Sequence, residues 1–293
     1  MMKALAASPM HDRHGSCRWV GMAQRSVIAI SAACVFSFGF AQNSAAPDNP
    51  SSTPEATALR TLPHHAFGPG EKLTYVLHYG WLNAGVATLE LKEAQDVGGR
   101  KVLHAVGLGE STGAFKTFYK VEDRYETYMD REGVFPYLFV RRVNEGGYTI
   151  NQDYTFMQRR QKVTTQEKKT FDVPAHVQDM LSAFYFARAT DYSNAKPGDI
   201  FTIPTFVDNE KWDLRIQYVG KETIKLRNGK YRCLKFRPVV QEGRIFKTND
   251  DLNVWITDDG NRIPVLAQAK VLVGSIKMEL SDYQGLANPI AKL

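Results

Sequence analysis

Apolar and polar residues alternate along many segments of this chain, and this period of two constrains the fold more than any other feature. In the segment 73–79, every odd position is Leu or Tyr. The same alternation runs through 148–156 and 212–218, where large apolar residues alternate with Asp, Asn, Thr, Arg and Gln. A helix would scatter these residues around its circumference, whereas a strand places them on one face. The pattern therefore predicts strands with one buried and one solvent-facing side.

Shorter or less regular alternation recurs at 87–91, 102–108, 118–129, 138–143, 234–240, 252–256, 265–273 and 276–280. Turn-forming pairs separate several of these runs: Gly98-Gly99, Gly146-Gly147, Asn228-Gly229 and Asp259-Gly260. Together they predict about a dozen strands joined by short connections, and therefore a mainly β, antiparallel sheet. Because strands twist, a sheet of this size cannot stay flat. We expect a large curled sheet that forms a half-open or closed barrel, or else two stacked layers.

One segment follows a different period. After Pro174, the residues Val177, Met180, Leu181 and Phe184 have the i, i+3, i+4, i+7 spacing of an amphipathic helix. We expect this helix at about residues 175–190, between two β halves. It would pack across the concave side of the sheet or plug one end of it.

The first 41 residues have the order of a secretory signal. Arg25 precedes an uncharged apolar run that ends with small residues at Gly39 and Ala41. We therefore expect residues 1–41 to be a signal peptide, with Met22 as a possible true start and no transmembrane segment after cleavage. A retained membrane anchor is the alternative, and a lipoprotein anchored at Cys34 is another, because Ser31–Cys34 resembles a lipoprotein processing box.

The remaining chain divides by composition. Residues 42–64 are rich in Ser, Pro and Ala and predict a flexible linker. Residues 65–287 hold the strand and helix patterns and predict one β-rich domain, followed by a C-terminal tail at 288–293.

Net charge argues against a nucleic-acid partner. The whole chain carries +6, from 37 basic and 31 acidic residues. The predicted signal peptide contains four bases and one acid, so cleavage would leave 33 bases, 30 acids and a net charge of +3. Such a charge is ordinary for a soluble domain, and nucleic acid is not an expected partner. Cleavage would also leave Cys233 as the one cysteine, which we interpret as a buried, inert thiol.

The chain contains no motif that predicts catalysis, a cofactor or a metal. It lacks a Gly-x-Ser-x-Gly elbow, His-Glu-x-x-His, a phosphate-binding Gly loop and Cys-x-x-Cys. His78, His104 and His176 occur singly. Asp179 and Arg188 form a possible buried polar pair, for which a structural role is the default. We therefore expect no catalytic residues, no cofactor and no metal site.

Aromatic residues are the strongest remaining signal. They make up 11% of the chain, enough either to line an apolar cavity inside a curled sheet or to fill its core. Six are candidate ligand-binding residues: Tyr75, Tyr79, Tyr125, Phe184, Trp212 and Trp255. The alternation also suits an outer-membrane barrel, but the strands are short and uneven and a helix interrupts them.

Several stretches together resemble an exported bacterial family of unknown function, DUF3108. They are Gly70–Tyr75, Asn83–Gly85, Asp123–Tyr128, Asp179–Tyr185, Val254–Asp259, Arg262–Val265 and Val273–Ile276. The resemblance spans about residues 67–286. It implies a β-rich envelope protein of Gram-negative bacteria, located in the periplasm, and it supplies no catalytic residues.

Three functional hypotheses follow. The first is a non-enzymatic periplasmic protein that binds a lipid-like or other apolar small molecule in the concavity of the sheet. The second is an envelope scaffold that binds a partner protein through an exposed sheet edge. The third is a hydrolase of envelope polymers, which would require Asp123, Asp179, Arg188 and His176 to meet in one cleft.

Overall fold

The computed structural model describes residues 58–239, 252–270 and 274–293. The predicted signal peptide, Met22, Cys34 and the linker residues 42–57 lie outside this part of the chain. Within it, fourteen strands form a single sheet, and every pair of neighbouring strands is antiparallel. The prediction of a mainly β, antiparallel fold is confirmed.

The first eight strands are β1 (Lys72–Tyr79), β2 (Leu82–Val97), β3 (Arg100–Ser111), β4 (Glu122–Asp130), β5 (Pro136–Glu145), β6 (Tyr148–Met157), β7 (Lys162–Thr165) and β8 (Thr170–Asp172). The remaining six are β9 (Ile200–Val207), β10 (Glu210–Leu226), β11 (Gly229–Pro238), β12 (Leu252–Thr257), β13 (Pro264–Lys270) and β14 (Ser275–Gln284).

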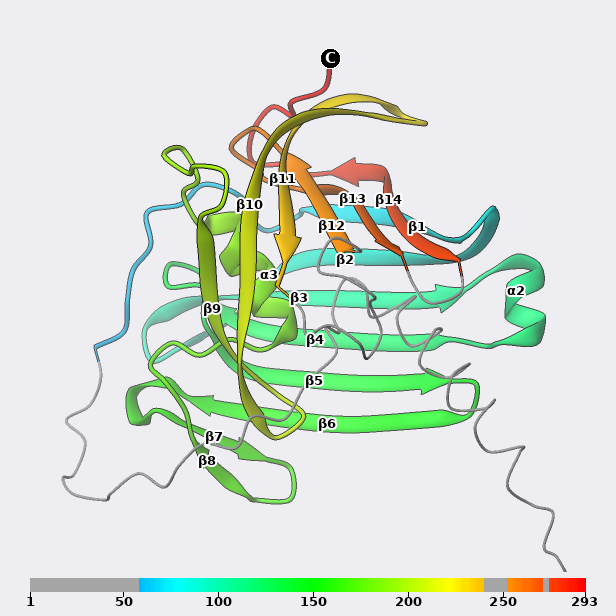
Figure 1. Cartoon of the computed structure of the whole chain (residues 1–293). Coiled ribbons are helices and arrows are strands. Elements are labelled where there is room, and N and C mark those ends of the chain that lie inside the picture. Colours follow the sequence, from blue (N-terminus) through cyan, green and yellow to red (C-terminus); the bar gives the residue numbers. More distant parts are fainter. Residues whose placement is uncertain (1–57, 240–251, 271–273) are drawn as a thin grey trace, which may run out of the picture.

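The sheet follows the chain order with one exception, the pairing of β1 with β14, which places the first and last strands at its centre. The two free edges are β8 and β9, which are consecutive in the sequence. The sheet curls until these edges approach the same region, as Figure 1 shows, but they do not pair with each other. The sheet is therefore a curled, unclosed one, the half-open form of the predicted barrel.

The connection between β8 and β9 spans part of the gap. The Val173 amide donates to the Gln161 carbonyl near β7. Gln178 then makes two backbone hydrogen bonds with β9, at Pro204 and Phe206, in a parallel bridge. This segment thus joins the two edges that the strands leave unpaired.

The helix α3 (Met180–Ala189) lies inside the curl, between β9 on one side and β4 on the other. It begins five residues later than the predicted helix, because Gln178 is extended and Asp179 caps the first turn. The Asp179 carboxylate accepts the amides of Leu181 and Ser182, and the Ser182 hydroxyl accepts the Asp179 amide. This reciprocal capping box fixes where the helix begins.

Two short helical elements were not predicted. The helix α2 (Gly113–Phe118) connects β3 to β4, and a 3-10 turn (Gln158–Arg160) connects β6 to β7. Both are shorter than the windows in which a helical period can be recognised.

The chain segments next to the sheet are in contact with it. Residues 58–64, which we assigned to the linker, bind the β4–β5 connection through hydrogen bonds that include Leu62 N–H to the Glu132 carbonyl. In the predicted tail, Lys292 forms a bridge with Tyr231 of β11. Contact with the domain therefore extends beyond the 65–287 boundaries that composition indicates.

Candidate functional site

An apolar cavity of about 110 Å³ lies between α3 and the inner face of strands β10 to β14. The helix contributes Met180, Ala183, Phe184, Ala187 and Arg188, and the other lining residues are Tyr192, Leu214, Ile216, Phe236, Pro238, Val254, Ile256, Arg262, Pro264, Ala267 and Met278. Apolar cavities of roughly 150 Å³ in other proteins stay dry and take up ligands of the size of benzene. This cavity can therefore accept part of an alkyl chain.

Two arginines are the charged residues among the cavity lining. The first, Arg188, donates from all three of its side-chain nitrogens: its guanidinium binds Glu71 in a bidentate ion pair, Nη1 to Oε1 at 2.6 Å and Nη2 to Oε2 at 2.7 Å. It also donates to the backbone carbonyls of Ala66 and Asn261. Both side chains of the ion pair are almost completely buried. Arg188 therefore holds three chain segments together.

The second arginine, Arg262, lies in the connection between β12 and β13 and is 22% exposed. Its Nη1 donates to the Arg188 carbonyl at 3.1 Å, and its Nη2 is 3.8 Å from the exposed Asp191 carboxylate. It is the one lining cation that water can also reach among the residues described.

The predicted pair of Asp179 and Arg188 is wrong as a pair, although both residues are buried. They occupy opposite ends of α3, where Asp179 caps the first turn and Arg188 reaches Glu71. Asp179 also accepts the Thr127 hydroxyl of β4 at 2.6 Å. Burial raises the pKa of Asp179 to about 6, and its hydrogen bonds oppose that rise. Its role is to fix the helix against the sheet.

Of the six candidate aromatic residues, Phe184 lines the cavity. Trp255 is buried, with its indole N–H donated to Glu222 and the Lys235 ammonium 4.8 Å from its ring. Trp212 is half-buried beside the cluster of Ala183, Ile203 and Leu214.

The three candidate tyrosines do not line the cavity. Tyr75 and Tyr125 belong to the main core, and Tyr79 is half-buried at the end of β1. The Tyr75 hydroxyl makes no hydrogen bond within the described part of the chain. Burial raises the pKa values of Tyr75 and Tyr125 far above the ordinary value for tyrosine. The structure therefore places most of the candidate aromatic side chains in the packed interior.

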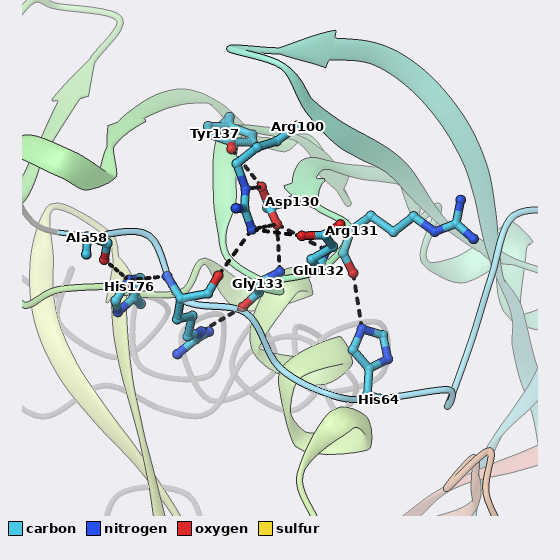
Figure 2. A network of polar contacts seen from close by, with 10 residues as sticks. Ala58, His64, Arg100, Asp130, Arg131, Glu132, Gly133, Tyr137 and His176 are labelled. Carbon is cyan, nitrogen blue, oxygen red and sulfur yellow. Dashed lines mark hydrogen bonds and ion pairs between the residues drawn. The ribbon is translucent and has the colours of Figure 1, made fainter.

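A polar network at the β4–β5 connection binds residues 58–64, as Figure 2 shows. Asp130 accepts the Arg100 guanidinium, the Tyr137 hydroxyl and the backbone amides of residues 132 and 133. Arg60 donates to the carbonyls of Gly133 and Val134 at 2.6 and 2.7 Å. Because all these groups are paired with one another or with backbone, the network is an anchor for the N-terminal segment.

His64 and His176 contribute to the same anchor. The His64 Nε2 is 3.1 Å from the Arg131 carbonyl, and the His176 Nε2 is 3.1 Å from the Ala58 carbonyl. Burial lowers the pKa of both imidazoles. His176, a residue of the hydrolase hypothesis, is therefore engaged with the N-terminal segment.

Two carboxyl groups form a second buried cluster, near the other end of β4 and β5. Asp123 is 4% exposed and Glu145 is 5% exposed. Burial, with the neighbouring Asp123 as the next cause, raises the pKa of Glu145 to about 8. Burial also raises the pKa of Asp123, although it accepts the Asn144 amide. Both buried carboxyl groups therefore favour the protonated form more than exposed carboxyl groups do.

Cys233 and His104 lie in surroundings that indicate structural roles. Burial raises the pKa of the Cys233 thiol to about 12, as expected for an inert thiol. His104 stacks on Tyr128 and contacts Glu126. Among the described residues, no group of three or more His, Cys, Asp or Glu side chains is placed to hold a metal, and no helix has the length and apolar composition needed to span a bilayer.

Sequence reasoning missed Glu71, Arg262 and most apolar residues of the cavity. Glu71 and Arg188 are 117 positions apart, so no local pattern relates them. The lining residues of β10 to β14 were recognisable as inward-facing strand positions. Nothing in their order indicates where packing leaves empty space.

Comparison with known proteins identifies the family. Residues 74–281 match the family described as protein of unknown function DUF3108, and the chain belongs to that family. No curated protein matches the chain.

Solved structures give distant similarities. A β-barrel-like protein of domain of unknown function DUF1849 from Brucella abortus has 9% identity and a TM-score of 0.45, over 74% of this chain and 97% of its own. A candidate exported protein with a YmcC-like fold from Bacteroides fragilis has 8% identity and a TM-score of 0.34, over 77% and 100% of the two chains. A candidate lipoprotein from Parabacteroides distasonis has 10% identity and a TM-score of 0.35, over 76% and 99%.

Proposed function

We propose that this protein is a non-enzymatic protein of the cell envelope that binds an apolar, lipid-like ligand in the cavity between α3 and strands β10 to β14. The observation that carries the proposal is the cavity itself, which has about 110 Å³ of empty space within an almost wholly apolar lining. Such a site favours an alkyl chain, because transfer of each methylene from water contributes roughly 0.8 kcal/mol.

The surroundings of the cavity favour binding over catalysis. Arg188 is engaged by Glu71 and two carbonyls, and no other lining residue carries a group that transfers protons near neutral pH. The residues of the hydrolase hypothesis have separate partners: Glu145 for Asp123, Thr127 for Asp179 and the N-terminal segment for His176. These separate partners favour structural roles for the three residues.

Export to the periplasm is part of the proposal and rests on the leader sequence. The apolar run before Ala41 has the features of a secretory signal. In that compartment, a protein that shields an alkyl chain from water would carry or retain a lipid-like molecule.

Binding is tested by thermal unfolding in the presence of 1-decanol. A ligand that binds only the folded state stabilises it by RT ln(1 + [L]/Kd). We expect the unfolding temperature to rise with decanol concentration. Ala187→Leu should reduce this rise, because residue 187 lines the cavity. Ala94→Leu, on β2 away from the cavity, is the matched control and should respond as the parent does. Equal responses of the two variants would contradict the proposal.

The scaffold hypothesis retains one specific observation. β9 is an edge strand, and Gln178 bridges its free side at Thr205. Within the described chain, no strand pairs with the free side of Ile200–Ile203. A partner strand could extend the sheet there. A photo-crosslinker at the exposed Thr202 distinguishes the two hypotheses in cells. A reproducible crosslink to one envelope protein, combined with no effect of decanol, would favour the scaffold.

A further inference from the structure

Two large aromatic side chains are almost fully exposed at one end of the sheet. Trp81, in the turn between β1 and β2, is 89% exposed, and Phe118, at the end of α2, is 86% exposed. Leu82, next to Trp81, is 39% exposed. We call these three residues, together with Lys116 and Lys120, the aromatic rim. Fully exposed aromatic side chains are unusual in a water-soluble domain, because burial of each would stabilise the fold by about 1.5–3 kcal/mol.

The helix α2 contributes no buried side chain to the core. It contains two phenylalanines, yet none of its residues is buried. Its preceding residue, Thr112, donates its amide to the Ala84 carbonyl at the start of β2, and this bond ties the helix to the turn that carries Trp81. Figure 1 shows α2 and the β1–β2 turn projecting from the same end of the sheet. The exposed aromatic residues therefore belong to two adjacent tips.

One unpaired lysine lies beside the exposed Phe118 on these tips. The segment 113–120 contains two lysines, of which Lys120 forms an ion pair with the exposed Glu122 at 2.9 Å, whereas Lys116 forms no ion pair with the described residues. Lys116 and Lys120 are both exposed and flank Phe118 in the sequence. Trp and other aromatic side chains favour the lipid–water interface, and nearby lysines are attracted to anionic headgroups. The exposed apolar residues stand on separate tips rather than forming the continuous patch that a protein interface requires.

We propose that the aromatic rim docks the protein onto the surface of an anionic lipid bilayer, with Trp81 and Phe118 entering the interfacial region. The proposal does not depend on the cavity, because no rim residue lines it. Docking would place the domain peripherally at a membrane surface without a membrane-spanning segment.

The test uses the protein as it is purified from the cells that produce it. The protein is mixed with vesicles of phosphatidylglycerol whose acyl chains are brominated. Bromine quenches only tryptophans that reach the acyl region. The quenching of the parent minus that of Trp81→Phe isolates the contribution of residue 81, because Phe keeps the apolar contact and removes the fluorophore. We expect this difference to be large with phosphatidylglycerol and small with phosphatidylcholine vesicles.

Partitioning in vesicle flotation measures affinity. Trp81→Ser combined with Phe118→Ser should lower the partition coefficient at least tenfold. Lys116→Gln should lower it about fivefold at low salt, which corresponds to roughly 1 kcal/mol. Lys120→Gln should lower it less, because Lys120 is already paired with Glu122. The matched control combines Val97→Ser, at the other end of β2, and Ile200→Ser, on the edge strand β9. Both residues are 44% exposed and lie outside the aromatic rim, so this variant should float as the parent does.

Three results would overturn the proposal. They are a parent without Trp81 quenching, a serine double variant that floats as well as the parent, and a parent that forms dimers which the double variant loses. The last result would assign the rim to a second copy of the chain. Because all four serine positions are exposed, unchanged unfolding temperatures are expected for both double variants.

Discussion

Arg188 and Glu71 form a bidentate ion pair within the curl of the sheet, with side chains that are 2% and 1% exposed. Arg188 comes from the last turn of α3, and Glu71 directly precedes β1 at the centre of the sheet. The aromatic rings of Phe67, Phe184 and Tyr185 surround the guanidinium at 5.2 to 5.6 Å. The ion pair therefore fixes the helix relative to the strand at which the two halves of the sheet meet.

Loss of either member of this pair should be strongly destabilising. Arg188→Met and Glu71→Leu should each lower the free energy of unfolding by about 3–5 kcal/mol, because each leaves a buried charge without its partner. The double variant should lose less than the sum of the two single variants, since no buried charge remains. Urea unfolding of the four proteins measures this coupling. Additive losses would contradict it.

The carboxyl pair of Asp123 and Glu145 should make stability depend on pH. The pKa of Glu145 is raised from an ordinary value of 4.5 to about 8 in the folded protein, so folding favours the protonated form. Its contribution is complete below about pH 4.5 and is lost as the pH rises towards 8. Glu145→Gln should remove this part of the decline, because the amide stays neutral over the whole pH range.

Unfolding temperatures at pH 5, 7 and 9 give the comparison. Glu122→Gln is the matched control, since Glu122 is an exposed glutamate at the start of β4. A decline in Glu145→Gln as steep as in the control would contradict the assignment.

Asp130 should hold the N-terminal segment on the domain. Asp130→Ala removes the acceptor that binds Arg100, Tyr137 and two backbone amides, and Arg100 also donates to the Arg60 carbonyl. We expect a loss of about 3 kcal/mol and faster hydrogen exchange at the Leu62 amide. Glu93→Gln, at an exposed acid on β2 outside this network, should leave the exchange of Leu62 unchanged.

Asp179 caps the first turn of α3 and accepts the Thr127 hydroxyl, and two substitutions distinguish the acceptor oxygen from the charge. Asn is as good an N-cap as Asp, whereas Ala lacks the acceptor oxygen. Asp179→Asn should therefore remain within about 1 kcal/mol of the parent. Asp179→Ala should lose about 2–4 kcal/mol, because the loss of the cap also leaves the buried Thr127 hydroxyl without its acceptor. Calorimetry of the two variants tests this order, and equal losses would contradict it.

The strands were predictable because alternation is a local property. One buried face forces a period of two, and β10 carries it from Trp212 to Tyr218 as expected. The beginning of α3 was also encoded locally, by Asp179 and Ser182 three positions apart, but the apolar spacing that includes Val177 extended the predicted helix past that signal.

The site was much less predictable, because it depends on contacts between distant residues. The partner of Arg188 lies 117 positions away, and the nearer Asp179 is at the wrong end of the helix to reach it. The aromatic content indicated large side chains without indicating where they leave space. Phe184 lines the cavity, whereas Tyr75 and Tyr125 fill the core.

The methyl groups of three buried methionines test the central claim most directly. Met180 and Met278 line the cavity, whereas Met129 is fully buried in the main core away from it. In a protein labelled with ¹³C-methyl methionine, titration with 1-decanol should shift the signals of Met180 and Met278 in a saturable manner and leave Met129 in place. Unmoved signals at Met180 and Met278, or equal shifts at all three residues, would contradict binding of an apolar ligand in this cavity.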